Sequence, residues 1–492
     1  MRSNSCVATF VGGVLSLGGV QAVAVGQCHH IGWTGDFATP SLGLGNAAAL
    51  DFRVFDPDGS GPLPAELVAA GNFITAGGSP ANRIARWNGS RWAALGSGLE
   101  NTANPTFCFA SALGIWDPDG PGQLNPRLVV AGRFNRAGSV PVLNVAQWDG
   151  QNWQAMGQGI SAAGIGAFSF AEFDPDGVGL QPSSLVIAGA EGFTVPPDTQ
   201  FTYTARWDGV EWTRIPFGVN GPYNIFDIEV FDEDGVGGAP PRLFAATDGF
   251  SGLYRWDGVE WTVVGGGLRS GNHLGDALAV VDEDGPGPGR AALFVGGFFT
   301  MAGNTPANYI ARWDGQQFTA IGAGLTNQAE AILPVYDPNG ASAPTIYAGT
   351  LANGVYRFDR ATGVWNQIGD SNAIALGEIP VRLHLFDEDG PAGHPPSIYY
   401  ASAGMTSISG TPSFGLARYG CRCYANCDGS WAPPSLNVND FICFMNRFAA
   451  ALALPPAAQQ ADFANCDGST VLPVLNVNDY VCFNNRFANG CP

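Results

Sequence analysis

One short turn sequence constrains the fold of this chain more than any other feature. It has the form Asp-X-Asp-Gly, follows an apolar or aromatic residue, and occurs seven times. The copies are residues 56–59, 117–120, 174–177, 232–235, 282–285, 337–340 (with Asn at the third position) and 387–390. Asp first, Pro tolerated second and Gly last are the preferences of a β-turn, and runs such as 52–55 and 67–70 predict a strand on either side. The repeat therefore predicts a hairpin that is built seven times.

A second hairpin follows the first in most units. Its mark is an aromatic residue followed by Asp-Gly or Asn-Gly, which favour a tight hairpin because both central residues tolerate positive φ. The copies are Trp87-Asn88-Gly89 with Trp92, Trp148-Asp149-Gly150 with Trp153, Trp207-Asp208-Gly209 with Trp212, Trp256-Asp257-Gly258 with Trp261, and Trp313-Asp314-Gly315 with Phe318. Each unit is therefore expected to hold four strands, at a spacing of about 50 to 60 residues that suits propeller blades.

Seven such units predict an all-β fold, a seven-bladed β-propeller of four-stranded blades. One sheet alone buries neither face, whereas stacking sheets around an axis buries both and protects the strand edges. The seventh unit lacks its last strand, because the chain enters a Cys-rich segment after residues 416–419. Trp33 to Phe37 has the sequence of the missing hairpin, so we expect an N-terminal strand to complete the last blade. A disulfide between the flanking Cys28 and Cys421 would lock that closure.

Two segments resemble the repeats of kelch and galactose-oxidase-like β-propellers. Residues 293–297 match the apolar run that ends in a Gly pair, and residues 358–365 match the aromatic-Asp and Trp spacing. The resemblance implies the propeller architecture for a domain over residues 25–420.

The composition limits the partners of this domain. The net charge is -20, from 42 Asp and Glu against 22 Lys and Arg, which argues against nucleic acid and anionic membrane surfaces. Residues 1–24 have the pattern of a secretion signal peptide, and no later apolar stretch approaches transmembrane length. We therefore expect a secreted or cell-surface protein without membrane insertion, in a compartment where disulfides persist.

The segment from residue 421 to 492 is a tandem repeat. Asn-Cys-Asp-Gly-Ser and Leu-Asn-Val-Asn-Asp occur once from residue 426 and again from residue 465. Phe441, Phe444, Met445 and Phe448 have the spacing of one buried helix face, and the second copy repeats it with Tyr480. We expect two helices that pack together.

This tail resembles a GC-type dockerin-like module, an α-helical, EF-hand-related domain at the C-terminus of some secreted bacterial proteins. The resemblance implies Ca²⁺ binding and a cohesin-like or surface anchoring partner. The implied calcium ligands are Asn426, Asp428, Asn437, Asp440, Asn465, Asp467, Asn476 and Asp479. Tyr424 and Phe463 stand where an EF-type loop opens with an acidic ligand, so we expect disulfides to replace part of the metal's role.

Cysteines of the tail, together with Cys28 near the N-terminus, are available for disulfides. Eight cysteines are expected to pair: Cys28, Cys421, Cys423, Cys427, Cys443, Cys466, Cys482 and Cys491. One set of pairs is Cys28 with Cys421, Cys427 with Cys443, Cys466 with Cys482 and Cys423 with Cys491, although eight cysteines allow many pairings. Cys108 lies in a predicted strand and is expected to be a buried free thiol.

Several features have both a structural and a functional interpretation. The Asp-X-Asp-Gly turns could bind cations, but turn preferences explain them if the second acidic residue is solvated. These turns and the Trp-Asp-Gly turns should share one strongly negative face. Long loops on the opposite face, at 72–83, 133–143, 298–309 and 404–415, could frame a glycan or peptide site above short loops, or vary without function. The Trp residues are expected in the core. The Arg residues that stand before five of the blade aromatics are expected in ion pairs between blades: Arg86, Arg206, Arg255, Arg312 and Arg418.

Catalytic motifs are scarce. The five His include no HExxH, and no Gly-X-Ser-X-Gly elbow occurs. A site assembled from carboxylates of several blades would be invisible in the sequence. We therefore expect a non-catalytic propeller that binds a protein or glycan and is anchored by its tail, and the alternative is a polysaccharide lyase or hydrolase delivered by the same tail.

Overall fold

The computed structural model describes most of the chain. The described residues are 31–421 with gaps, 438–452, 476–478, 480 and 481. The gaps are 40, 42, 45–48, 60, 62, 90, 121–123, 163–166, 176–182, 219–223, 236–238, 250, 270–274, 286–288, 338–341, 351–353, 371–380, 389–395 and 403.

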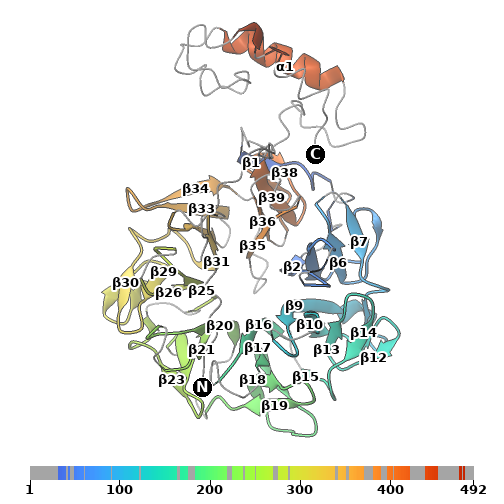
Figure 1. Ribbon diagram of the computed structural model, residues 1–492, viewed down its shortest axis with the longest axis vertical. Helices are drawn as coiled ribbons and strands as arrows, with labels where there is room; N and C mark the ends of the chain where they lie inside the picture. The colour runs from blue at the N-terminus through green and yellow to red at the C-terminus, as the bar shows by residue number, and fades with distance from the viewer. Residues whose placement is uncertain are drawn as a thin grey trace, which may run out of the picture.

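Seven antiparallel sheets, which we number in chain order, contain four main strands each within the described residues (Figure 1). Sheet 1 is β2 (Ala49–Phe55), β3 (Glu66–Gly71), β6 (Ile84–Trp87) and β7 (Trp92–Ala94); sheet 2 is β9 (Phe109–Trp116), β10 (Arg127–Arg133), β13 (Val145–Trp148) and β14 (Trp153–Ala155). Sheet 3 is β16 (Ala167–Phe173), β17 (Ser184–Thr194), β18 (Thr202–Trp207) and β19 (Trp212–Ile215), with β15 (Ser161–Ala162) paired to β17; sheet 4 is β20 (Ile225–Phe231), β21 (Arg242–Thr247), β22 (Leu253–Trp256) and β23 (Trp261–Val263). Sheet 5 is β25 (Ala277–Val281), β26 (Ala292–Gly296), β29 (Ile310–Trp313) and β30 (Phe318–Ala320); sheet 6 is β31 (Ala329–Val335), β32 (Thr345–Thr350), β33 (Gly354–Asp359) and β34 (Val364–Gly369). Sheet 7 is β35 (Arg382–Phe386), β36 (Ser397–Ala401), β39 (Leu416–Cys421) and β1 (Ile31–Thr34).

Short elements occupy the loops. They are β4 (Thr75–Ala76), β5 (Ser79–Pro80), β8 (Leu99–Glu100), β11 (Arg136–Ala137), β12 (Val140–Pro141), β24 (Leu268–Arg269), β27 (Met301–Ala302), β28 (Thr305–Pro306), β37 (Ser407–Ile408), β38 (Thr411–Pro412) and the 3-10 helix Pro105–Phe107.

The first strands of the sheets form a ring. Strands β2, β9, β16, β20, β25, β31 and β35 each contact the next one, and β35 contacts β2 again (Figure 1). A nearly all-β ring of antiparallel sheets around an axis is a β-propeller arrangement. The hydrophobic core is accordingly divided into clusters that lie between neighbouring sheets, for example between sheets 2 and 3.

The N-terminal strand completes sheet 7, as the sequence predicts. β1 pairs antiparallel with β39, with Trp33 opposite Tyr419. The Trp33 indole donates to the carbonyl of Ile368 at 2.7 Å, and Arg418 lies 3.3 Å from Asp36. The two ends of the ring are thus joined by backbone pairing and an ion pair, and the indole hydrogen bond connects β1 to sheet 6.

The repeated Trp residues belong to the core, as predicted. Trp87 and Trp92 are buried with ring centroids 5.3 Å apart, and Phe37 packs against both. Trp148 of sheet 2 and both Trp256 and Trp261 of sheet 4 are half-buried.

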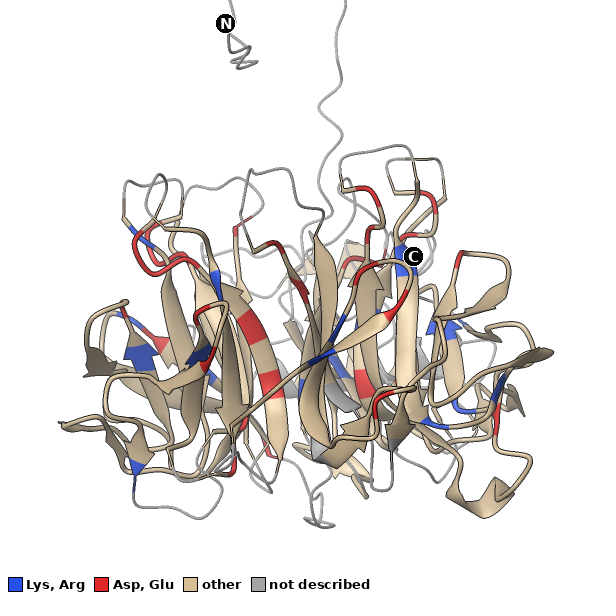
Figure 2. Ribbon diagram, turned by 90° about the horizontal axis from the view of Figure 1, so that it is seen from below, with Lys and Arg blue, Asp and Glu red and all other residues tan. Residues whose placement is uncertain are grey.

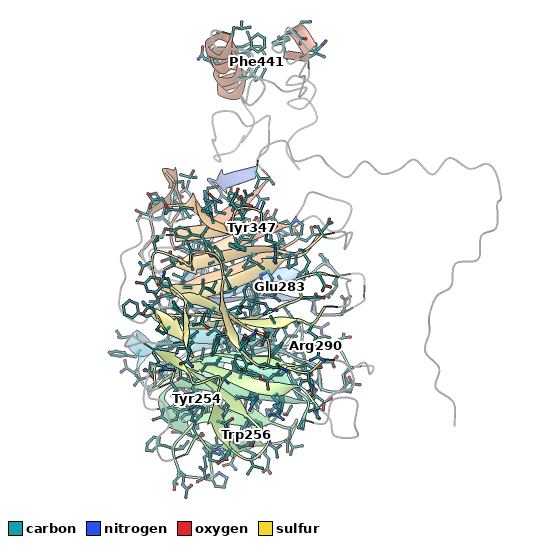
Figure 3. All side chains as sticks on the ribbon, turned by 90° about the vertical axis from the view of Figure 1, so that its left-hand side faces the viewer. Tyr254, Trp256, Glu283, Arg290, Tyr347 and Phe441 are labelled. Atoms are coloured by element: carbon teal, nitrogen blue, oxygen red, sulfur yellow. The ribbon has the colours of Figure 1, made fainter. Side chains whose placement is uncertain are left out.

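The tail contains the first predicted helix, α1 (Val438–Ala451). Phe441, labelled in Figure 3, lies 6.0 Å from Tyr480 of the second repeat between ring centroids, so the two repeats contact each other. Phe444 is fully buried, but Met445 is 40% exposed, so its assignment to the buried helix face is wrong. The spacing of Met445 fits that face only at its edge, where the side chain turns to solvent. None of the helices in the described part of the chain is long and apolar enough to cross a membrane.

Candidate functional site

Charged side chains gather where the first strands meet at the axis of the ring. We name this set the axial cluster: Asp51 and Arg53 on β2, Asp227 and Glu229 on β20, Asp276 beside β25, Glu330 on β31, and Arg382 and His384 on β35. Asp227 interacts electrostatically with Arg382 and Arg53, which come from sheets 7 and 1. Side chains from separate sheets therefore converge on one place.

Bulges in the first strands help to aim the carboxylates. The pairing register shifts between Ala49 and Asp51 in β2 and between Ile225 and Asp227 in β20. A third shift flanks Glu330 in β31. A bulge re-aims the side chain beside it, so the same local irregularity places an acidic group near the axis in three sheets.

Each of these carboxylates binds the backbone of the following sheet. Asp51 accepts the N–H of Leu113 at 2.7 Å, and Asp227 accepts that of Leu278 at 2.9 Å. These bonds connect the first strands of neighbouring sheets, where two strands cannot pair directly.

Two further hydrogen bonds of this kind connect sheet 6 with sheet 7 and sheet 7 with sheet 1. Glu330 accepts the N–H of Val381 at 2.9 Å. His384 accepts the N–H of Val54 through Nε2 at 3.3 Å, which requires a neutral imidazole with its proton on Nδ1. The cluster therefore holds adjacent sheets together around the axis.

The two guanidinium groups share one carboxylate. Arg382 Nε and Arg53 Nη1 lie 3.5 Å and 3.7 Å from Asp51 Oδ1, a side chain that is almost fully buried. Two positive charges around one buried carboxylate leave positive potential on the side of sheets 7 and 1. The acidic groups of sheets 4, 5 and 6 lie in the remaining part of the ring.

The environment shifts the protonation of this cluster. Burial, and then the charge of Asp227, raise the pKa of Glu229 to about 7. Burial raises the pKa of Glu330 to about 7, and burial together with the charge of Glu330 raises the pKa of Asp276. Burial, followed by the charge of Arg53, lowers the pKa of His384 to about 4. Two carboxyl groups can therefore exchange protons near neutral pH.

The acidic turns lie at one side of the ring, where Figure 2 shows most of the loops with acidic residues. The second Asp is exposed in three of these turns, at Asp119, Asp234 and Asp284, as its predicted solvation requires. In four turns the second Asp also accepts a backbone N–H five residues further on: Asp58 from Leu63, Asp119 from Leu124, Asp234 from Ala239 and Asp284 from Gly289.

Four of the five Arg residues before the blade aromatics pair within their own sheet, which corrects the prediction of pairs between blades for these four. Glu233 lies 2.5 Å from Arg255, and Glu283, labelled in Figure 3, pairs with Arg312. The same holds for Arg86 with Glu66 and Arg418 with Glu388. The turn and the third strand are neighbours in one sheet, so the Glu reaches its own Arg first.

Neighbouring sheets are still linked through some of these Glu residues. Glu233 accepts the indole N–H of Trp313 from sheet 5 at 2.9 Å. Arg360 of sheet 6 lies 3.5 Å from Glu283 of sheet 5.

The long loops of the opposite face are small hairpins. They contain β4 and β5, β11 and β12, β27 and β28, and β37 and β38. The short loops that would form notches between them include residues 250 and 351–353, which lie outside the described residues.

The predicted residues of the tail are mostly outside the described part. Asn426, Asp428, Asn437, Asn465, Asp467 and Asp479, and likewise Cys28, Cys423, Cys427, Cys466, Cys482 and Cys491, are not described. Asp440 and Cys443 lie in α1 and Cys421 in β39, where their side chains are not described. Asn476 accepts the N–H of Asn478 at 2.9 Å, as at a helix start. The calcium ligands and disulfides remain predictions, whereas Cys108 is a buried free thiol as expected.

The axial cluster was missed by the sequence prediction, although the chain contains a signal for it. In three units the charged residues stand five and three positions before the first Asp of the turn: Asp51 and Arg53, Asp227 and Glu229, Arg382 and His384. Charged residues at alternate positions of an otherwise apolar first strand mark the side that faces the axis.

No protein-family model matches the chain, and no curated protein matches it. Solved structures with a similar fold include BBS1N in complex with ARL6DN, at 12% identity and a TM-score of 0.43, covering 79% of this chain and 97% of that one. The WD40 β-propeller domain of Doa1 is 11% identical with a TM-score of 0.31, covering 63% and 90%. The GH74 enzyme of Niastella koreensis is 13% identical with a TM-score of 0.39, covering 76% and 43%. At these TM-scores the similarities carry no argument about function, and the fold rests on the ring of sheets itself.

Proposed function

We propose that this chain is a secreted, seven-bladed propeller that binds a protein or glycan without converting it, and that its dockerin-like tail anchors it to a cohesin-like or surface partner. Each of the seven sheets is one blade in this proposal. The tail would hold Ca²⁺, disulfides or both.

The observation that supports binding over catalysis is the bonding of the axial cluster. Asp51, Asp227, Glu330 and His384 each accept a backbone N–H from the next sheet. A catalytic base must be able to accept a proton from a substrate, and these acceptors are already used to hold the ring. The hairpins of the opposite face are instead the part of the ring that varies from sheet to sheet, as binding loops do.

Binding and turnover on one set of polysaccharides test this proposal. The mature chain is applied to a glycan array and to a proteome-wide pull-down, and the same glycans are assayed for reducing ends and unsaturated products. Binding without any product supports the proposal. Product formation by the wild-type chain refutes it.

A second candidate function is a polysaccharide lyase or hydrolase at the axis. It is favoured by Glu229, which has a pKa of about 7 and is not one of the four acceptors named above. If product forms, the variant Glu229→Gln distinguishes this enzyme from a contaminant, because it should abolish turnover and leave the fold intact. Turnover that survives this variant excludes Glu229 as the catalytic acid or base.

The tail is tested by calorimetry of the full chain with calcium or with a chelator, before and after reduction. If disulfides replace part of the metal's role, the oxidised tail should melt at a similar temperature with and without calcium. Reduction should then make its melting depend on calcium. Calcium dependence in the oxidised chain would contradict the replacement.

A further inference from the structure

Four of the hairpin loops share one backbone arrangement, and one of them differs in its side chains. In each loop the residue before the third strand has positive φ: Arg83 at 68°, Asn144 at 60°, Tyr309 at 65° and Gly415 at 72°. The N–H of each binds the carbonyl of an equivalent residue: Phe73, Phe134, Phe299 and Met405. These four positions can therefore be compared directly.

Positive φ is costly for a bulky residue, and Gly or Asn adopts it most easily. Sheet 7 uses Gly415 and sheet 2 uses Asn144, in agreement with this preference. A bulky residue that persists at such a position calls for a reason in its side chain.

The side chains of Arg83 and Asn144 form hydrogen bonds that account for their positive φ. Arg83 donates to the carbonyl of Pro105 at 3.4 Å, and Asn144 donates to that of Ile160 at 2.9 Å. No hydrogen bond of the Tyr309 hydroxyl is found within the described residues. Its ring instead packs at the edge of the core and against Phe298, with 5.8 Å between the centroids and 34° between the planes.

Phe298 is also exceptional at its own position. It is 36% exposed, and its equivalents in sheets 1, 2 and 7 are Asn72, Arg133 and Gly404. Within the described hairpin loops, sheet 5 thus presents two neighbouring aromatic rings where the others present polar, charged or no side chains.

The hairpin segment that carries this pair has no charged residue of its own. No residue from 297 to 310 carries a charge in a chain with a net charge of -20, and the polar residues there are Thr and Asn. Arg269 of the preceding connection binds Asn304 at 3.3 Å. Phe298 is the exposed ring of the pair, and Tyr309 is half-buried. An accessible aromatic ring can cover the C–H face of a sugar ring, while neighbouring hydroxyl and amide groups hydrogen-bond the sugar hydroxyls. A polyanion would instead need a cluster of positive charge.

We propose that Phe298 and Tyr309 form a subsite that stacks a pyranose ring of a neutral glycan. This subsite rests on the binding function proposed above and names the glycan as its ligand. The rings supply the contact area, and the Thr and Asn residues of the hairpin supply the hydrogen bonds.

The test is affinity electrophoresis of the full mature chain in gels with xyloglucan, mixed-linkage β-glucan or galactomannan, with alginate as the acidic comparison. Phe298→Ala and Tyr309→Asn should each weaken binding of the retarding neutral glycan roughly tenfold. Tyr309→Asn keeps a residue that tolerates positive φ, so its melting temperature should stay close to that of the wild type. Tyr309→Phe keeps the ring and Asn72→Ala alters the matching position of sheet 1, and both should bind as the wild type does.

The outcomes separate this subsite from the proposed function. If the wild type binds a neutral glycan and both ring variants bind equally well, the subsite is refuted and the binding function stands. If no neutral glycan retards the wild type, or only alginate does, the subsite is also refuted, while capture of a protein ligand would preserve the binding function. Turnover of a glycan by the wild type overturns the proposed function whatever the ring variants do.

Discussion

Acidic residues occur in two regions of this ring, at the turns and at the axis, and the two regions treat the same chemical group in opposite ways. At the turns, backbone N–H groups of Glu260 and Val259 lower the pKa of Asp257. At the axis, burial raises the pKa of Asp227, although it also accepts hydrogen bonds. The difference teaches that the surroundings of an Asp, and not the residue type, decide the direction in which its pKa shifts. Asp56 fits this rule, because burial raises its pKa although it lies in a turn.

The two regions also differ in what their hydrogen bonds connect. A turn carboxylate binds backbone of its own turn or loop, so its loss should be local. An axial carboxylate binds the neighbouring sheet, so its loss should weaken the ring. Four predictions test this contrast.

The largest effect is expected for Asp227→Ala. The change leaves the Leu278 N–H and the Ser169 hydroxyl, now 2.9 Å and 2.7 Å from the carboxylate, without their acceptor. The free energy of unfolding, measured by urea denaturation, should fall by about 3 kcal/mol. Asp227→Asn keeps an acceptor and should cost less. If Asp227→Ala lowers the free energy of unfolding no more than the loss of a turn Asp does, axial and turn carboxylates do not differ in their contribution to the ring.

The next effect concerns pH. Because the pKa values of Glu229 and Glu330 are raised to about 7 in the fold, the folded state binds protons that the unfolded state has released. Their stabilisation is therefore full below the unfolded pKa of about 4.3 and is lost as the pH rises to about 7. Each should contribute about 2 kcal/mol to this decrease, after allowance for partial exposure to water.

The variants Glu229→Gln and Glu330→Gln should flatten that pH profile. His384 acts in the opposite direction, because its lowered pKa makes the fold less stable as the pH falls from about 6.5 towards 4. Denaturation curves from pH 4.5 to 8 would show both slopes. If the difference in stability between the wild type and each Gln variant does not change with pH over this range, the assignment to the two Glu residues is contradicted.

A smaller effect is expected for Asp314→Ala at a turn. Partial burial alone would raise the pKa of Asp314, but the N–H groups of Gln317 and Gln316, at 2.8 Å and 2.9 Å, outweigh it and lower the pKa. Removing the carboxylate should cost about 1 kcal/mol at neutral pH. The difference from the wild type should vanish as the pH falls below about 4, since a depressed pKa stabilises only the ionised form.

The smallest effect is expected for Glu66→Gln. Glu66 lies 2.9 Å from Arg86, but the Arg86 side chain is 45% exposed, so solvent and salt screen the pair. The change should lower the free energy of unfolding by less than about 0.5 kcal/mol, and added salt should reduce this loss further. A loss comparable to that of Asp314→Ala would show that charge alone, without backbone hydrogen bonds, stabilises this side of the ring.

Much of the fold could be predicted from the sequence, because turns and strand periodicity are local properties. The Asp-X-Asp-Gly and Trp-Asp-Gly turns specify where each hairpin reverses. The missing strand of the seventh unit and the matching segment at Trp33 predicted the pairing of β1 with β39, which the structure confirms. The sequence also placed Cys108 and most of the Trp residues in the core correctly.

The partners of the charged residues could not be predicted in the same way. The distance along the chain from Asp227 to Leu278 gives no hint that they meet, because the contact arises only when two sheets are set side by side around the axis. The pairing of Arg312 with Glu283 within one sheet depends on which strand stands next to the turn.

The sequence by itself determined the units, their turns and the order in which they follow one another, since each depends on residues a few positions apart. Only the tertiary structure decided which acidic groups lose contact with water and which strained loop presents two aromatic rings. Burial and convergence are properties of the closed ring, where side chains from distant units share one small volume.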